Sequence, residues 1–148
     1  MFDHEKLDVY RVAIKFVTWS YQLCKRLKGA DRHARDQLLR ASHSIPLNIA
    51  EGNGKLPSPD RERFQRIALG SALECAAALD VLCACGAIEP EDAQTGKALL
   101  TRIVAMLTKM TTRPMRMREE AEYEYECEYD KDGVHQPLAA GDPDKPCA

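Results

Sequence analysis

Residues 35–54, RDQLLRASHSIPLNIAEGNG, decide the fold of this chain. Their apolar residues recur at gaps of three and four, the spacing of one face of an α-helix: Leu38, Ala41, Ile45 and Ile49. Pro46 lies in the middle of this face and has no N–H, so the carbonyl of Ser42 loses its helical partner. Because the apolar spacing keeps its phase through the proline, we predict one kinked helix here and not two.

An amide and a carboxylate follow the proline one helical turn apart, at Asn48 and Glu51, just before Gly52. This spacing places both side chains on the same helix face. They either form a binding contact or fasten the helix end to the next loop through Arg61 or Arg63. The second interpretation is favoured, because a kink and a glycine-rich turn leave backbone groups that need partners.

The helical period extends over the rest of residues 1–114. It predicts helices at about 3–28, 31–53, 58–85 and 89–112, with Pro114 as the stop of the last. Short connections between four helices indicate an all-α, antiparallel up-down-up-down four-helix bundle. A length of 148 residues suits one such domain.

Large apolar residues form two stripes along the first predicted helix. The heptad seam, which we expect to face the core, contains Leu7, Tyr10, Ile14, Val17, Tyr21 and Cys24. Phe16 and Trp19 lie off this seam. They are either partly exposed or form a second buried face against another subunit, and the second interpretation is favoured because exposed aromatic side chains tend to mark interfaces.

The third predicted helix is rich in small residues, which are Ala68, Gly70, Ser71, Ala72, Ala76, Ala77 and Ala78. A glycine inside a helix costs about 1 kcal/mol relative to alanine. Gly70 therefore suggests that the backbone of a neighbouring helix comes close, and a solvent-facing position is the alternative.

The net charge of −2 combines two segments of opposite sign. Residues 1–114 carry 17 Lys and Arg against 13 Asp and Glu, whereas residues 115–148 carry 4 against 10. We expect a bundle over 1–114 and an acidic tail over 115–148, first a partial helical extension and then disordered from about residue 130. The tail is a candidate to fold back over the basic surface and compete with a polyanion.

Catalytic and metal-binding patterns are missing from the sequence. There is no Glu-x-x-His pair for a di-metal bundle, no glycine-rich phosphate loop and no HExxH. We therefore predict no enzyme activity, no cofactor and no metal. The charged N-terminus, the free cysteines and the absence of a long apolar run indicate a cytoplasmic protein without membrane contact.

Basic residues gather at the two ends of the predicted bundle, where each group is a candidate to bind phosphates. One end carries Lys25, Arg26, Lys28, Arg32 and Arg35, and the other carries Lys55, Arg61, Arg63 and Arg66 with Lys109 and Arg113. Arg40, on the second helix, completes the candidate nucleic-acid-binding set. Assembly of several copies would multiply the avidity of such weak patches.

The segments QLLRASHSIPLNIAEGNGK and FQRIALGSALE strongly resemble the 23S rRNA intervening-sequence protein family, also called four helix bundle proteins, over about residues 5–112. The matching positions are Gln37, Leu38, Arg40, Ala41, Ser44, Ile45, Asn48, Ile49, Ala50, Glu51 and Gly52, then Phe64, Ile67, Ala68, Gly70, Ser71 and Glu74. The resemblance implies a homopentameric ring of bundles, in a family whose activity is mostly unsettled. The accessory proteins of diversity-generating retroelements, which bind nucleic acid and a reverse transcriptase, form a related group.

Together these observations predict a non-enzymatic, homo-oligomeric scaffold that binds structured RNA or DNA through basic surface residues, and the resemblance implies that the oligomer is a homopentamer. The alternative is a protein–protein adaptor, for example for a reverse transcriptase or another nucleic-acid enzyme, which would use the face of Phe16 and Trp19 or the tail. Pro46, Asn48, Glu51, Gly52, Gly70 and Ser71 are interpreted as structural motif residues.

Overall fold

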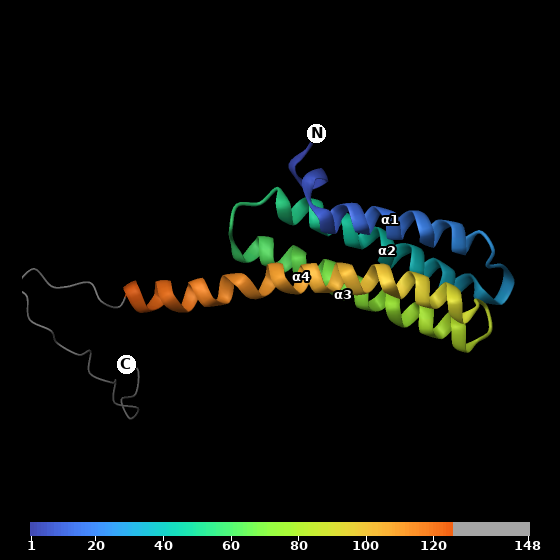
Figure 1. Ribbon diagram of the computed structural model, residues 1–148. Helices are drawn as coiled ribbons and strands as arrows, with labels where there is room; N and C mark the ends of the chain where they lie inside the picture. Colours follow the sequence, from blue (N-terminus) through green and yellow to red (C-terminus); the bar gives the residue numbers. More distant parts are fainter. Residues whose placement is uncertain (126–148) are drawn as a thin grey trace, which may run out of the picture. The chain divides into compact units, whose positions relative to one another are not determined.

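The computed structural model describes the backbone of residues 1–125 and the side chains of residues 1–112. Four helices make up this part of the chain: α1 (Asp8–Cys24), α2 (Arg32–Asn53), α3 (Pro59–Ala84) and α4 (Pro90–Tyr125). Two short 3-10 turns, η1 (Asp3–Lys6) and η2 (Gly29–Asp31), precede α1 and α2. Residues 1–125 contain no strand, so the predicted all-α four-helix bundle is confirmed (Figure 1).

The bundle is built on α2, which packs along α3 over most of its length and along α1 on its other side. The chain divides at Pro114 into two units, and the bundle described here lies in Met1–Pro114. The predicted core stripe of α2 is confirmed, because all four of its residues are buried: Leu38, Ala41, Ile45 and Ile49. The helix continues unbroken through the buried Pro46, as predicted. Ser42, whose carbonyl the proline leaves free, donates its own hydroxyl to the carbonyl of Leu39 at 2.8 Å.

The core face of α1 is shifted by about one position along the sequence from the predicted seam. Phe16 is fully buried, and it lies on a stripe that also includes Val9, Val12, Ala13, Ser20, Leu23 and Cys24. Ile14 and Tyr21, which belong to the predicted seam, are 41% and 44% exposed. Two neighbouring apolar stripes have the same period, so the spacing alone does not choose between them. Packing selects the stripe that contains Phe16, because burying this ring removes a large apolar area from water.

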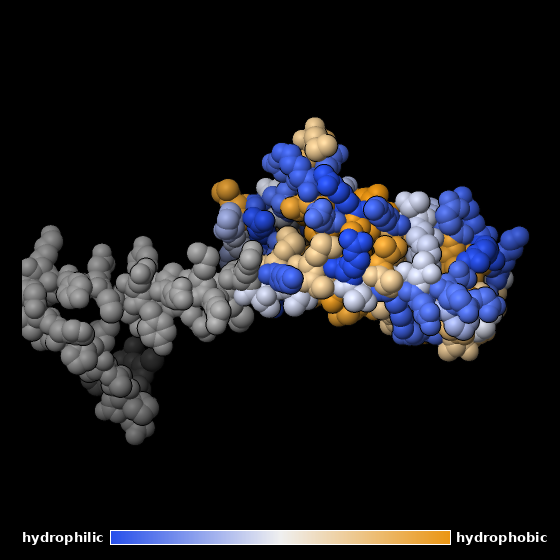
Figure 2. Space-filling view, viewed as in Figure 1, coloured by the Kyte–Doolittle hydropathy of each residue, from blue (hydrophilic) through white to orange (hydrophobic). Residues whose placement is uncertain are grey.

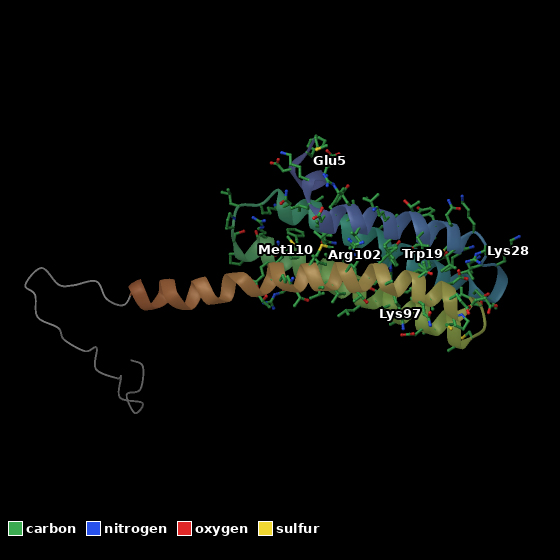
Figure 3. All side chains as sticks on the ribbon, viewed as in Figure 1. Glu5, Trp19, Lys28, Lys97, Arg102 and Met110 are labelled. Carbon is green, nitrogen blue, oxygen red and sulfur yellow. The ribbon has the colours of Figure 1, made fainter. Side chains whose placement is uncertain are left out.

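Trp19 packs inside the bundle and does not form an outward face with Phe16. A Cβ atom built on Gly96 of α4 would overlap the Trp19 ring and would lie 2.7 Å from Cδ1 of Leu79. The glycine therefore makes room for the indole between α1, α3 and α4, as the labelled side chain in Figure 3 indicates. The predicted intersubunit face of Phe16 and Trp19 is wrong, because Phe16 is fully buried in the core of its own chain and the partly buried Trp19 packs against the same core.

The predicted ends of α2 and α3 and the predicted start of α4 agree with the structure to within one residue, whereas the ends of α1 and the C-terminal end of α4 do not. Ser58 caps α3, its Oγ accepting the backbone N–H of Arg61 at 3.4 Å. The first helix begins at Asp8, since η1 occupies the residues before it. α4 runs through Pro114 to Tyr125, so the predicted stop at this proline is wrong. The segment after Pro114 is rich in Met, Arg, Glu and Ala, which are strong helix formers. The disorder expected from about residue 130 lies outside the described residues.

α3 contains a long, mostly apolar window. An 18-residue window has a mean hydropathy of 1.8, so by length and composition alone it could cross a membrane, a test that the core helix of a bundle also meets. Its core face carries Ala68, Ala72, Cys75 and Leu79, which pack in the bundle, but only 39% of the window is buried. The rest of the helix presents apolar side chains to the surface.

Candidate functional site

The first basic group lies at the end of the bundle where α1 connects to α2. It contains Lys25, Arg26, Lys28, Arg32 and Arg35, and Lys28 is labelled there in Figure 3. The structure also brings the first turn of α4 to this end, because Arg26 forms a 2.9 Å ion pair with Asp92. Arg35 is half-buried and pairs with Asp36 at 3.0 Å.

Acidic residues largely neutralise this first group. Asp31 and Asp36 are its neighbours in sequence, and α4 adds Glu89, Glu91 and Asp92 in its opening residues. The five basic side chains therefore share one end of the bundle with five carboxylates. The sequence analysis noted the first two acids and missed the contribution of α4. An antiparallel topology and a first turn rich in acids were the signals that indicated it.

The second basic group lies at the turn between α2 and α3, where it contains Lys55, Arg61, Arg63 and Arg66. The ammonium of Lys55 lies 5.8 Å above the centre of the Phe64 ring. Arg66 pairs with Glu62 one helical turn earlier. Arg61 and Arg63 form no ion pair among the residues whose side chains are described.

This second end has the more favourable charge balance. α4 returns the exposed Lys109 toward this end, and η1 with the first turn of α1 adds Lys6 and Arg11 but also Asp3, Glu5 and Asp8. Seven basic side chains then stand against six carboxylates, the other three being those of Glu51, Asp60 and Glu62. The side chain of Arg113, also expected here, lies outside the described ones. A surface of this kind binds phosphates through charge and positions them without reading a base sequence.

Arg40 belongs to neither end. It lies on the exposed side of α2, where its guanidinium donates to Gln37 Oε1 at 2.7 Å and lies 3.9 Å from Glu74 of α3. Gln37 in turn donates its amide to the same Glu74 carboxylate. These three residues bridge α2 and α3 at the surface, so Arg40 is already engaged in holding the two helices together.

A second polar bridge joins the same two helices one to two turns further along. Asn48 donates its amide to the carbonyl of Ser44 at 2.7 Å and to its hydroxyl at 3.0 Å. Ser71 of α3 donates to the same Ser44 hydroxyl at 2.8 Å. Asn48 thus has the structural role that was predicted, but its partners are Ser44 and, through it, Ser71. The expected fastening through Arg61 or Arg63 is wrong.

Glu51 and Gly52 close this motif at the end of α2. Glu51 is exposed and has no hydrogen bond or ion pair to another described side chain. Gly52 is buried where α3 passes closest: an added Cβ would lie 3.1 Å from Cβ of Phe64 and 3.3 Å from the carbonyl oxygen of Arg61. The glycine therefore lets the start of α3 come close to the end of α2.

Gly70, in contrast, has no such role within the chain. It is exposed on α3, and a Cβ built on it meets nothing within 4 Å. The expected close approach of a neighbouring helix is wrong for the described part of this chain.

The described side chains offer little for catalysis. They contain no group of three His, Cys, Asp or Glu residues placed to hold a metal ion. Burial raises the pKa of the Cys75 thiol to about 12 and that of Cys24 to about 11. Both thiols are therefore protonated and unreactive at neutral pH.

These features define a helical-bundle protein whose motif residues join α2 to α3 and whose charged groups lie at the bundle ends. Residues 5–109 match the family described as 23S rRNA-intervening sequence protein. The chain belongs to this family, and the resemblance found in its sequence is confirmed.

Among solved structures, the chain is similar to a protein with unknown function from the S23 ribosomal protein family of Bacteroides thetaiotaomicron VPI-5482, whose crystal structure was determined at 1.70 Å. The TM-score is 0.66 at 24% sequence identity, over 70% of this chain and 98% of the other. At this identity the likeness supports the fold alone. A comparison with curated proteins gives no match.

Proposed function

We propose that this protein is a non-enzymatic, homo-oligomeric scaffold that binds structured RNA or DNA through the turn between α2 and α3. The residues that bind phosphates are Lys55, Arg61, Arg63 and Arg66, with Lys109 of α4. The contacts are electrostatic and independent of base sequence, so the ligand class is a folded polyanion and not one particular sequence.

The observation that carries this proposal is the different pairing of the basic side chains at the two ends of the bundle. At the α1–α2 end the carboxylates equal the basic side chains in number, and Arg26 is already ion-paired with Asp92. At the α2–α3 end the basic side chains exceed the acids, and Arg61 and Arg63 have no described carboxylate partner. Unpaired guanidinium groups bind phosphate without first breaking an ion pair.

Two charge-matched triple variants test this assignment. Lys55→Gln/Arg61→Gln/Arg63→Gln removes three charges from the proposed surface, and Lys25→Gln/Lys28→Gln/Arg32→Gln removes three from the other end. Binding to a labelled stem-loop RNA and to a DNA duplex is measured by fluorescence anisotropy between about 50 and 200 mM salt. Each lost phosphate contact lowers the slope of log K against log salt by about 0.9 for duplex DNA.

We expect the first variant to lose about 2 to 3 units of that slope, with most of its affinity at low salt, and the second to keep wild-type behaviour. Equal losses in the two variants would overturn the choice of surface. Binding of the wild type that does not change with salt, or no binding at low salt, would overturn the proposal of phosphate recognition itself.

The adaptor alternative loses the surface that motivated it, since Phe16 is fully buried and Trp19 packs beside Gly96. Its other suggested surface, the acidic tail, lies largely outside the described residues.

A further inference from the structure

Two neighbouring helices of the bundle carry no acid over most of their length. Residues 9–30 contain no Asp or Glu, and neither do residues 93–112. The outward sides of these helices carry three exposed cations, Lys15 on α1 and Arg102 with Lys109 on α4. None of the three forms an ion pair among the residues whose side chains are described. We call these three cations the α1–α4 row.

α1 and α4 pack side by side and run antiparallel. Trp19 of α1 faces Gly96 of α4, and Arg26 pairs with Asp92 at 2.9 Å. Facing positions of an antiparallel helix pair keep a nearly constant sum of residue numbers, which is here 115 (19 and 96) and 118 (26 and 92). The same sum places Lys15 beside residues 100–103 of α4, which is the level of Arg102.

Lys15 lies on the side of α1 that borders α4. A helix turns by about 100° per residue, so Lys15 stands about 40° around α1 from Trp19, which packs beside α4. It stands about 120° around the same helix from Tyr21, which stacks on His43 of α2. The ammonium of Lys15 is therefore directed outward and toward α4.

Arg102 and Lys109 lie on the side of α4 that borders α1. Arg102 stands about 80° around α4 from Asp92, the partner of α1, and about 140° from Lys97, which pairs with Asp80 of α3. Lys109 follows Arg102 two turns later on the same side, at a distance of about 10 Å along the helix. Figure 3 labels Arg102 on α4, away from both ends of the bundle.

Like charges thus lie at the same level on neighbouring helices, with no acid on either helix segment to separate them. Like charges placed close together repel each other, and an anion bound between them removes that repulsion. On the face shown in Figure 2, where α4 lies in front as in Figure 1, hydrophilic side chains are scattered among apolar ones. A row of separate cations suits a polymer with repeated phosphates, whereas one small anion contacts only part of it.

We propose that the sugar–phosphate backbone of a nucleic acid lies along the α1–α4 row and is bound by Lys15, Arg102 and Lys109. The inference rests on the proposed function and extends its surface from the turn between α2 and α3 along the side of the bundle. Lys109 belongs to both surfaces, because α4 returns to that turn. Contacts of this kind orient the backbone along the helix axes and read no base.

A charge-matched pair of variants tests the row. Lys15→Gln/Arg102→Gln removes two charges from it, and Lys25→Gln/Lys28→Gln removes two from the α1–α2 end; all four side chains are exposed. Affinity for a labelled DNA duplex and a stem-loop RNA is measured by fluorescence anisotropy between about 50 and 200 mM salt, and folding by circular dichroism. Each phosphate contact contributes about 0.9 to the slope of log K against log salt for duplex DNA, so the row variant should lose about 2 units and the control none.

Lysine footprinting of the wild-type protein gives a second measurement that depends on no variant. Lysines are acetylated with an N-hydroxysuccinimide ester with and without the duplex, and mass spectrometry compares the two states. Lys15 and Lys109 are expected to be protected, and Lys25 and Lys28 to react as in the free protein. Inorganic phosphate at the same phosphate concentration should not protect Lys15. A reactive Lys15 in the complex, a row variant with the wild-type slope, or equal protection by inorganic phosphate would overturn the inference.

The inference and the proposed function fail separately. If Lys55→Gln/Arg61→Gln/Arg63→Gln loses salt-dependent binding while the row variant keeps it, the row is overturned and the α2–α3 surface stands. If the row variant alone loses binding, the row stands and the choice of the α2–α3 surface falls. Protection of Lys15 by a polyglutamate peptide, but by neither nucleic acid, would overturn the row as a nucleic-acid surface in favour of an acidic protein partner.

Discussion

Gly96→Ala and Gly70→Ala add the same methyl group at two mid-helix glycines with opposite surroundings. At Gly96 the new Cβ would lie 2.7 Å from Leu79 and would overlap the Trp19 ring. At Gly70 it would meet nothing within 4 Å. Neither glycine has a positive φ, so the backbone accepts alanine at both sites. The two substitutions therefore differ in packing and not in backbone strain.

The expected free energies follow from two terms. Replacing glycine by alanine inside a helix gains about 1 kcal/mol, because the unfolded chain loses less conformational freedom. Forcing a methyl group into a filled core costs about 1 to 3 kcal/mol, because Trp19 or Leu79 must leave its place. Gly70→Ala receives only the gain and is expected to stabilise the chain by about 0.5 to 1 kcal/mol. Gly96→Ala receives both terms and is expected to destabilise it by about 1 kcal/mol, with a range of about 0 to 2.

Urea unfolding followed by circular dichroism measures both values. The variants are compared at several protein concentrations, so that any contribution of self-association to the free energy of unfolding is detected. A midpoint shift at constant slope reports stability alone. Trp19→Leu is then added to Gly96→Ala; because a smaller side chain leaves room for the methyl group, the two substitutions should be less costly together than their sum. An increase in stability for Gly96→Ala, or a clear loss for Gly70→Ala, would refute the packing described here.

Three further outcomes are expected. Asn48→Ala should lower the free energy of unfolding by about 1 to 2 kcal/mol, measured by urea unfolding, because Ser44 loses a donor; a loss below about 0.3 kcal/mol would show that the bridge is unimportant. Gly52→Ala should be less stable than Gly70→Ala in the same assay, since its Cβ would lie 3.1 Å from that of Phe64 and the neighbour must shift to accept it; a variant as stable as Gly70→Ala would contradict this. Stability should fall as the pH rises from about 9 toward 12: burial raises the pKa of Cys75 to about 12, so the unfolded chain releases the thiol proton at lower pH than the folded chain does. Cys75→Ala should reduce the fall in melting temperature over this pH range. An unchanged pH dependence would argue against the buried thiol as its cause.

The parts of the fold that the sequence predicts well are those where a single apolar stripe exists. In α2, Leu38, Ile45 and Ile49 offer only one face to a core, and the proline does not disturb their phase, so both the helix and its burial follow. α3 also places residues at gaps of three, four and seven on one face, and Ser71, Cys75 and Leu82 on that face are buried.

The prediction fails where two stripes compete or where space decides. α1 has two neighbouring apolar stripes, one of which includes Phe16. Only the fit of that ring between the other helices selects the stripe that is buried. Gly70 and Gly96 are both mid-helix glycines in the sequence, but only the three-dimensional neighbours show that the second one faces Trp19. For the candidate site, the basic residues could be found from their positions, whereas the neutralising acids of α4 required the antiparallel packing.

In the proposed homo-oligomer, self-assembly and nucleic-acid binding are linked through symmetry. Rotation about a ring axis brings the α2–α3 turn of every copy to the same side of the assembly. A set of basic side chains that is weak in one copy, such as Lys55, Arg61 and Arg63, then acts together on one polyanion, and the effective concentration of each added site is set by the ring. On this reasoning a variant that is monomeric in sedimentation velocity and keeps every basic residue should bind RNA at least tenfold more weakly than the assembled protein. Equal affinity of the assembly and the monomer would show that assembly has no role in binding.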